Sequence, residues 1–201
     1  MNNNIETFLN VLEPEDTSTG GGSASAIAGA MAGALLSMCC QLSTKEAGEY
    51  EDALRKTAIL AKELSSQLLE GGTQDTLAFQ AVRSAYQLSK ETEVDRETRR
   101  QAIQAAWYQA ARVPLDNAAR CLQVARLAAD LAGQINPRVH SDLSCAMLLA
   151  RTGALGCLEN VEINLPSLKD ATIISNLKEL ANSLRAQLAA LDTNDNPASP
   201  T

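Results

Sequence analysis

The segment between Asp16 and Lys45 limits the possible folds more than any other part of the chain, because its 28 residues carry no charge. Small residues recur within it every three or four positions, which places them on one face of an α-helix. They are Ala26, Gly29, Ala30, Gly33 and Ser37. Such a stripe lets another helix approach closely. We therefore predict a buried helix over residues 23–43, with tight core contacts and a subunit seam along the stripe rather than a direct ligand role.

A membrane-spanning helix is the main alternative for this segment, since Gly29 and Gly33 have the spacing found in membrane helix dimers. However, the segment has no aromatic or basic anchors for a membrane interface. The residues before it are acidic, whereas a signal peptide requires positive charge there. The sequence therefore predicts a cytoplasmic protein that does not associate with membranes.

Alanine and leucine dominate the composition, with 33 and 28 occurrences, and only 3% of the residues are aromatic. This favours packed helices over sheets. Apolar periodicity predicts an all-α bundle of about six to seven helices in a single domain over residues 1–191, followed by a disordered polar tail over 192–201. The expected helices cover residues 3–12, 23–43, 46–70, 73–89, 95–135, 142–160 and 168–191.

Local signals set several of the expected helix ends. The pair Gly71-Gly72 is expected to stop the helix over 46–70. Pro114 is expected to kink or break the helix over 95–135, because proline lacks a backbone donor. The short helix over 3–12 carries apolar side chains on one face, which is typical of a lid or a docking arm.

Charge and residue counts exclude several classes of site. The net charge of −7 disfavours nucleic acid and anionic membranes as partners. His140 is the single histidine of the sequence, so a multi-histidine metal site is impossible and we predict no metal. The five cysteines form no C-x-x-C pair. They are expected to be reduced, buried thiols.

A glycine run, Gly20-Gly21-Gly22, leads through Ser23 directly into the uncharged helix. Glycines let backbone N–H groups approach a ligand, and a helix N-terminus favours negative or electron-rich groups. The run is neither a P-loop nor a dinucleotide fingerprint. From these residues alone, a binding loop and a flexible linker with a capping serine remain equally open.

Five segments in order resemble the formiminotransferase-cyclodeaminase C-terminal family, which includes formimidoyltetrahydrofolate cyclodeaminases and stand-alone methenyltetrahydrofolate cyclohydrolases. They are GGGSASAIAGAMAGALLSM at 20–38, DTLAF at 75–79, VPL at 113–115, SD at 141–142 and NVEINL at 160–165. The resemblance implies an all-helical homodimer that takes a tetrahydrofolate derivative as substrate, without a prosthetic group. The chain departs from the family at Thr19, where proline is usual, and before Asp75, where relatives often have another acid.

The resemblance also implies site residues. Asp75 is the catalytic candidate, because a carboxyl near the cationic one-carbon centre can stabilise its charge and transfer protons. Without the resemblance, Asp75 is an acid in the first turn of helix 73–89 that complements the helix dipole. The candidates for substrate binding are Gly20, Gly21, Gly22, Ser23, Asp142, Asn160 and Asn164. Helix capping explains Asp142 and the two asparagines equally simply.

The glutamate tail of a folate requires a cation. The basic residues nearest the motifs are Lys90, Arg112, Arg138 and Arg151, each of which is also explained as surface charge. Trp107 and Tyr108 are interpreted as core or subunit contacts.

The leading functional hypothesis is hydrolysis of 5,10-methenyltetrahydrofolate to 10-formyltetrahydrofolate. It is preferred because the chain carries no formiminotransferase domain that would make the formimino substrate. The first alternative is formimidoyltetrahydrofolate cyclodeaminase, which closes the ring and releases ammonia. The second is a non-catalytic helical module for folate binding or assembly.

Overall fold

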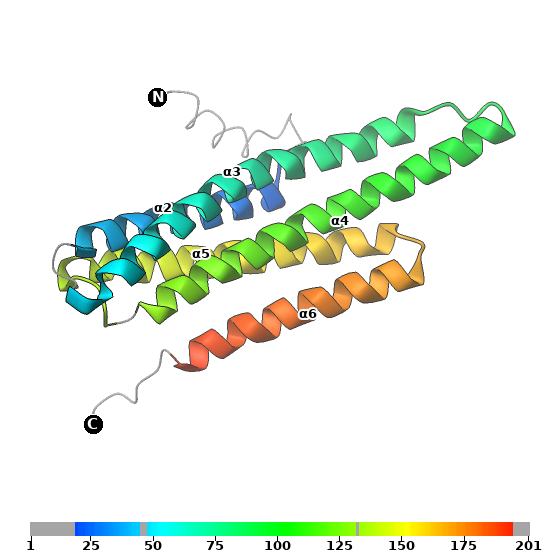
Figure 1. Cartoon of the computed structure of the whole chain (residues 1–201). Coiled ribbons are helices and arrows are strands. Elements are labelled where there is room, and N and C mark those ends of the chain that lie inside the picture. Colours follow the sequence, from blue (N-terminus) through cyan, green and yellow to red (C-terminus); the bar gives the residue numbers. More distant parts are fainter. Residues whose placement is uncertain (1–18, 45–47, 132, 195–201) are drawn as a thin grey trace.

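A computed structural model describes residues 19–44, 48–131 and 133–194, and these form a bundle of long helices (Figure 1). The helices are α2 (Gly21–Ser43), α3 (Glu51–Gln87), α4 (Glu93–Asp130), α5 (His140–Asn164) and α6 (Ala171–Asn194). Three single-turn helices connect them: η2 (Gly48–Tyr50), η3 (Pro137–Val139) and η4 (Leu165–Ser167). The all-α prediction is confirmed over these residues.

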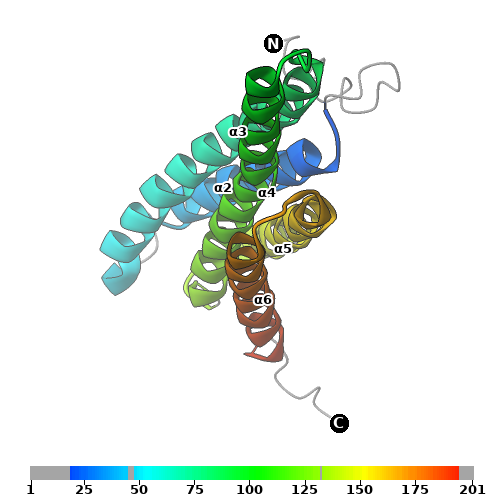
Figure 2. The ribbon, with the colours of Figure 1, turned by 90° about the vertical axis from the view of Figure 1, so that its right-hand side faces the viewer.

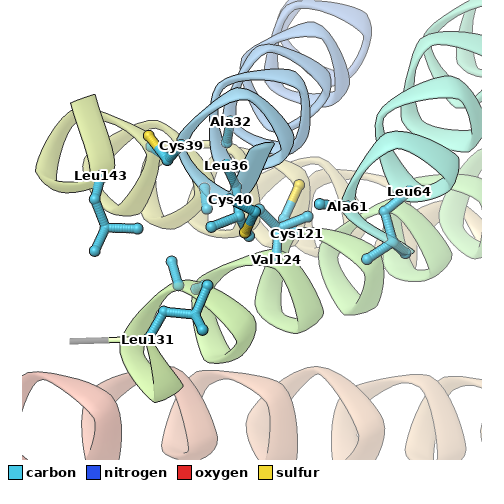
Figure 3. Close-up of a cluster of buried hydrophobic side chains, with 14 of the residues drawn as sticks. Ala32, Leu36, Cys39, Cys40, Ala61, Leu64, Cys121, Val124, Leu131 and Leu143 are labelled. Carbon is cyan, nitrogen blue, oxygen red and sulfur yellow. The ribbon is translucent and has the colours of Figure 1, made fainter. Parts of the chain in front are cut away.

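Helix α2 lies at the centre of the bundle, between α3 and α5, and α4 crosses it (Figure 2). Helix α6 packs against α4 and α5 on the side away from α3. The core forms where α2 meets its three neighbours. Figure 3 shows Leu36 and Cys40 of α2 lying close to Cys121 and Val124 of α4. All four of these side chains are fully buried.

The small residues of α2 face other helices of the same chain. A Cβ atom added to Gly29 would lie 2.3 Å from Cys121 Sγ, and one added to Gly33 would lie 2.8 Å from the Ala61 carbonyl oxygen. The whole predicted stripe is buried. The expected core packing is therefore confirmed, and the stripe is not the subunit seam that we also expected along it.

The core position of α2 also accounts for the lack of charge on its buried face. Among the described helices, α2 is the one that is long and apolar enough to cross a membrane, and 56% of its apolar stretch is buried inside the bundle. Contacts with α3, α4 and α5 cover this part of its surface. A central core helix requires the absence of charge on this covered part of its surface.

The described residues form five α-helices, so the predicted number of six to seven is wrong for them. The helices expected over 46–70 and 73–89 are one helix, α3, because Gly71 and Gly72 do not end it. A Cβ atom on Gly71 would lie 2.1 Å from Oδ1 of Asn117, on α4, and Gly72 is buried against α2. Close packing on both sides thus offsets the low helix propensity of glycine, about 1 kcal/mol per residue.

Two of the sequence predictions concern the ends of the chain. The helix predicted over residues 3–12 lies outside the described residues. Helix α6 continues to Asn194, three residues into the stretch expected to be a tail, and residues 195–201 are not described.

Four of the five cysteines are buried, as expected, whereas Cys145 is exposed. Burial is the main cause that raises the pKa of the Cys39 thiol to about 11 and that of Cys40 to about 12. These two thiols are therefore protonated and unreactive near neutral pH.

Helix α4 runs without a break through Pro114, where a kink or a break was expected. Proline has no N–H, so the carbonyl of Ala110 loses its usual partner four residues later. Asn164 of α5 replaces that partner, since its Nδ2 donates to the Ala110 oxygen at 2.7 Å. A side chain of the neighbouring helix thus satisfies the backbone group that Pro114 leaves free, and the helix continues.

This arrangement predicts that Pro114 and Asn164 are energetically coupled. Asn164→Leu is expected to reduce the free energy of unfolding by about 1–3 kcal/mol, because it leaves the Ala110 carbonyl without a donor. In a Pro114→Ala background the new N–H can bond to Ala110, so the same substitution should cost less. Denaturant unfolding of the four proteins measures the coupling. An equal cost of Asn164→Leu in both backgrounds would show that the two residues act independently.

Candidate functional site

A pocket of about 340 Å³ opens where the N-terminus of α2 meets α3, α4 and α5. Its lining residues are Gly20, Gly21, Gly22, Asp75, Phe79, Trp107, Ala110, Asn160, Ile163 and Asn164. Residues of three resembling segments, 20–38, 75–79 and 160–165, therefore meet at one place. Most of the predicted site residues are among them.

The Asp75 carboxyl group lies against the first turn of α2. A Cβ atom on Gly22 would be 2.5 Å from Asp75 Oδ1 and 2.6 Å from Oδ2, so a side chain at position 22 would displace the carboxyl group. Asp75 itself lies inside α3, and the expected place in the first turn of its own helix is wrong. The carboxyl group instead faces the N-terminus of a different helix, which favours negative charge.

Ser23 holds this carboxyl group in place. The Ser23 hydroxyl oxygen lies 3.0 Å from Asp75 Oδ2, 3.0 Å from the Gly72 carbonyl oxygen and 3.1 Å from the Thr76 hydroxyl. Its single proton can go to either the carboxyl group or the carbonyl. The side chain is 2% exposed and is not part of the pocket lining. Ser23, predicted to bind substrate, thus contacts Asp75 from behind the pocket.

Two opposing effects set the proton affinity of Asp75. Burial raises the pKa of its carboxyl group above the usual value. Hydrogen bonds from the side chain and the backbone of Ser23 favour the charged form and lower this pKa in part. A carboxyl group of this kind can exchange a proton closer to neutral pH than an exposed aspartate can.

Asn160 and Asn164 lie one helical turn apart on α5, and both line the pocket. The Asn160 Nδ2 donates to the Gly156 carbonyl at 2.9 Å, and it lies 3.3 Å from the place of a Cβ on Gly21. Because the Asn164 Nδ2 is bonded to Ala110, both amide nitrogens already have partners. Within the described residues neither side-chain oxygen accepts a hydrogen bond, so two acceptors remain for a ligand.

Asp142 does not belong to this pocket. It lies in the first turn of α5, 18 residues before Asn160, which corresponds to about 27 Å along a helix. The predicted grouping of Asp142 with Asp75 in one chain is therefore wrong, because a continuous helix holds its two ends apart. Its neighbour His140 begins the same helix and is equally distant.

The sequence interpretation missed the apolar wall of the pocket. Phe79, Trp107 and Ile163 line it, and Phe79 and Ile163 are 36% and 75% exposed. Phe79 follows Asp75 by one helical turn, so helical spacing alone could have identified it. Trp107 is on α4, and its place depends on how α3 and α4 pack.

Asp75 is the one charged residue among the described residues that line the pocket. None of the predicted cations lines it. Arg112 forms an ion pair with Asp116 at 2.9 Å, and Arg138 precedes α5 at the end that holds Asp142. Within the ranges that the structure describes, no three His, Cys, Asp or Glu side chains are placed to hold a metal ion.

Sequence comparison places these features among known proteins. The chain is 37% identical, over 194 residues, to a methenyltetrahydrofolate cyclohydrolase from Methylorubrum extorquens, covering 95% of this chain and 93% of that protein. It is 29% identical over 182 residues to the formimidoyltransferase-cyclodeaminase of Rattus norvegicus. That match covers 90% of this chain but only 34% of the rat protein.

Structural comparison gives the same result. The crystal structure of formiminotetrahydrofolate cyclodeaminase from Thermotoga maritima superposes with a TM-score of 0.79 at 27% identity, covering 90% of this chain and 87% of that one. The profile of the formiminotransferase-cyclodeaminase family matches residues 4–183. The chain therefore belongs to the formiminotransferase-cyclodeaminase family, as its five sequence segments predicted.

Proposed function

We propose that this protein hydrolyses 5,10-methenyltetrahydrofolate to 10-formyltetrahydrofolate. The observation that carries the proposal is the partly buried Asp75 carboxyl group, held by Ser23 at the edge of a pocket with an aromatic wall. The substrate class is supported by the Methylorubrum relative, which is named a methenyltetrahydrofolate cyclohydrolase and matches almost the full length of both chains.

The charge of the pocket suits this substrate. The carbon that bridges N5 and N10 shares a positive charge with both nitrogens, and a nearby carboxylate stabilises that charge. Asp75 is the one charged group among the described lining residues, so no cation opposes the substrate there. Exclusion of water from the apolar side of the pocket strengthens the attraction.

Asp75 can carry the protons that the reaction moves. Its carboxylate takes a proton from water as the water oxygen bonds to the bridging carbon. When the bond from that carbon to N5 breaks, Asp75 returns the proton to N5. The remaining hydroxyl proton leaves to solvent as the formyl C=O forms on N10, so one water is consumed and one proton released. A raised pKa matches a group that both accepts and donates.

The remaining lining residues can bind and orient the pterin. The backbone of Gly20, Gly21 and Gly22 offers a surface without side chains, and Phe79 and Trp107 offer aromatic faces or edges for a flat ring. The free side-chain oxygens of Asn160 and Asn164 can accept hydrogen bonds from pterin N–H groups. We assign these residues to binding and Asp75 to proton transfer.

Cyclodeamination of formimidoyltetrahydrofolate is the second candidate. It is favoured by the structural similarity to the formiminotetrahydrofolate cyclodeaminase from Thermotoga maritima. In that reaction N10 attacks the carbon of the protonated formimino group, and the Asp75 carboxylate takes the N10 proton. Asp75 then gives this proton to the amino group as the bond between that group and the carbon breaks and ammonia leaves. The same pocket serves both reactions, so an assay of each substrate decides between them.

We also propose that two copies associate through the exposed face of α2. Met31, Met38 and Leu42 lie on this face and are 52%, 37% and 54% exposed. They are spaced by seven and four residues, so they form one apolar strip on a helix without charges. An uncharged strip can pair with its own copy without repulsion, although each chain carries a net charge of −7.

Replacing the carboxyl group of Asp75 tests the proposed activity. Asp75→Asn is expected to reduce kcat by about 10²-fold or more, because an amide cannot accept the proton from water. Loss of methenyltetrahydrofolate absorbance, corrected for the buffer rate, measures it. Glu70→Gln makes the same change at an exposed site on the same helix and should have no effect. Unchanged turnover in Asp75→Asn would support the non-catalytic alternative or another base.

The pH profile tests the role of Ser23. Asp75 must be ionised to accept a proton, so kcat/KM should fall as pH decreases through the raised pKa of its carboxyl group. Ser23→Ala removes a hydrogen bond that lowers this pKa, so the acidic limb should move to higher pH. If the acidic limb of the kcat/KM profile stays in place or moves to lower pH, the role assigned to Ser23 is contradicted. Circular dichroism checks that the variant is folded.

Charge reversal tests the proposed dimer. Met38→Glu places two like charges at the expected contact, so it should convert a dimer into a monomer. Leu180→Glu, at an apolar position of α6 that is 48% exposed, is the matched control and should remain dimeric. Light scattering after size exclusion gives the mass of each protein. A monomeric wild type, or a Met38→Glu variant that is still dimeric, would refute this interface.

A further inference from the structure

A strip of aromatic and basic side chains leads away from the pocket along α3. Asp75, Phe79, Arg83 and Tyr86 follow each other at intervals of three or four residues, so they share one face of the helix. From Asp75 to Tyr86 the strip extends by about 16 Å along the helix axis. It follows the hairpin of α3 and α4, which extends beyond the other helices at its closed end (Figure 1).

Helix α4 adds Trp107 and Arg99 to the same strip, and both of these side chains contact Tyr86 of α3. Trp107, which lines the pocket, directs its ring N–H at the Tyr86 hydroxyl at 3.4 Å. The Arg99 guanidinium lies 5.5 Å from the centre of the Tyr86 ring and donates to the Tyr86 carbonyl at 3.1 Å. A continuous series of contacts therefore connects the wall of the pocket with a cationic group outside it.

The two arginines of the strip are not neutralised by carboxylates. Within the described residues neither Arg83 nor Arg99 forms an ion pair. Other arginines of the chain do form ion pairs, among them Arg55, Arg96, Arg100, Arg112 and Arg185. Asp95, one turn before Arg99, is instead bonded to Ser89 and Thr92 at the start of α4. Arg83 thus keeps its full capacity to bind a carboxylate, whereas Arg99 donates from Nε and Nη2 to the Tyr86 carbonyl and keeps its Nη1 donors for one.

A folate needs such a site outside the pocket. Its pterin and p-aminobenzoyl parts are flat and suit the glycines and aromatic residues described above. Its glutamate carries carboxylates, however, and Asp75 is the one charged group among the described lining residues. Because the whole chain is acidic, these carboxylates must find cations locally. Guanidinium groups bind carboxylates with two parallel hydrogen bonds.

We infer that Arg83 and Arg99 bind the glutamate carboxylates of the substrate, while Tyr86, next to Trp107, contacts its p-aminobenzoyl ring. The inference rests on the proposed function, since it assigns residues to the part of a folate that lies outside the pocket. It also replaces the cations expected from the sequence, which were chosen for closeness to the motifs along the chain. Arg83 is instead close to the pocket because it follows Asp75 and Phe79 on one face of α3. Arg99 is close because α4 packs against α3 at Tyr86.

The test compares two substrates in the Arg83→Gln/Arg99→Gln double variant. One is 5,10-methenyltetrahydrofolate, and the other is 5,10-methenyltetrahydropteroate, which lacks the glutamate. KM for the first should rise about tenfold, with kcat changed by less than about twofold, because the lost hydrogen bonds act on binding alone. KM for the second should change much less, because it lacks the glutamate and loses only the support that Arg99 gives to Tyr86. In the wild type, KM for the glutamate-bearing substrate should also rise with salt concentration, and the double variant should lose this dependence.

Two further variants separate tail binding from structural effects. The Arg83 side chain forms no hydrogen bond or ion pair within the described residues, so Arg83→Gln should raise KM several-fold without affecting stability. Arg100→Gln removes the next arginine of α4, which is paired with Glu97, and should leave both KM values unchanged. Equal changes for both substrates, or no change for either, would overturn the inference.

Failure of the proposed function would be recognised separately. If the wild type turns over neither substrate, the cyclohydrolase proposal fails, and the strip is tested by titration with p-aminobenzoylglutamate and p-aminobenzoate. The arginine strip predicts tighter binding of the first compound, and loss of that preference in the double variant. Equal affinity for both compounds in the wild type would show that the strip does not recognise glutamate.

Discussion

The close approach of three helices to α2 is the constraint on which the rest of the structure depends. At Gly29 and Gly33 any side chain would overlap the sulfur of Cys121 or the backbone of α3. Burial of a helix without charges is favourable only because small residues let its neighbours cover it. This packing fixes the direction of α2. It thereby fixes the point at which the helix begins, which is the edge of the pocket.

The site is a consequence of that geometry. The N-terminus of α2 meets the middle of α3, so the free backbone groups of one helix face the carboxyl group of Asp75 on another. Ser23 belongs to the same turn of α2 and is bonded to both Asp75 and the backbone of α3. Asn164 connects α5 to α4 at the opposite wall. The groups that build the pocket are therefore also contacts between helices, and they are held rigidly.

Much of this could be predicted from the sequence, because it depends on local patterns. The core helix follows from the uncharged segment, and the glycine run, Asp75 and the two asparagines from the family resemblance. The predictions that were wrong rest on local sequence signals whose effect is changed by contacts with residues distant in the sequence. Gly71 and Gly72 continue a helix because α2 and α4 fill the space beside them, and Pro114 is accommodated by an amide 50 residues away in the sequence. Asp142 was placed in the site by its motif, but the length of α5 separates it from the pocket.

The closed end of the α3–α4 hairpin has a different stability from the rest of the molecule. Its own small cluster consists mostly of alanines, with Val82 and Ile103 as the larger members. A projection of two helices buries little apolar surface, so it can open without unfolding the bundle. Amide hydrogens there are expected to exchange with solvent sooner than those of α2. Arg83, Tyr86 and Arg99 lie on this part, so a ligand that contacts them would slow that exchange and stabilise the end of the hairpin.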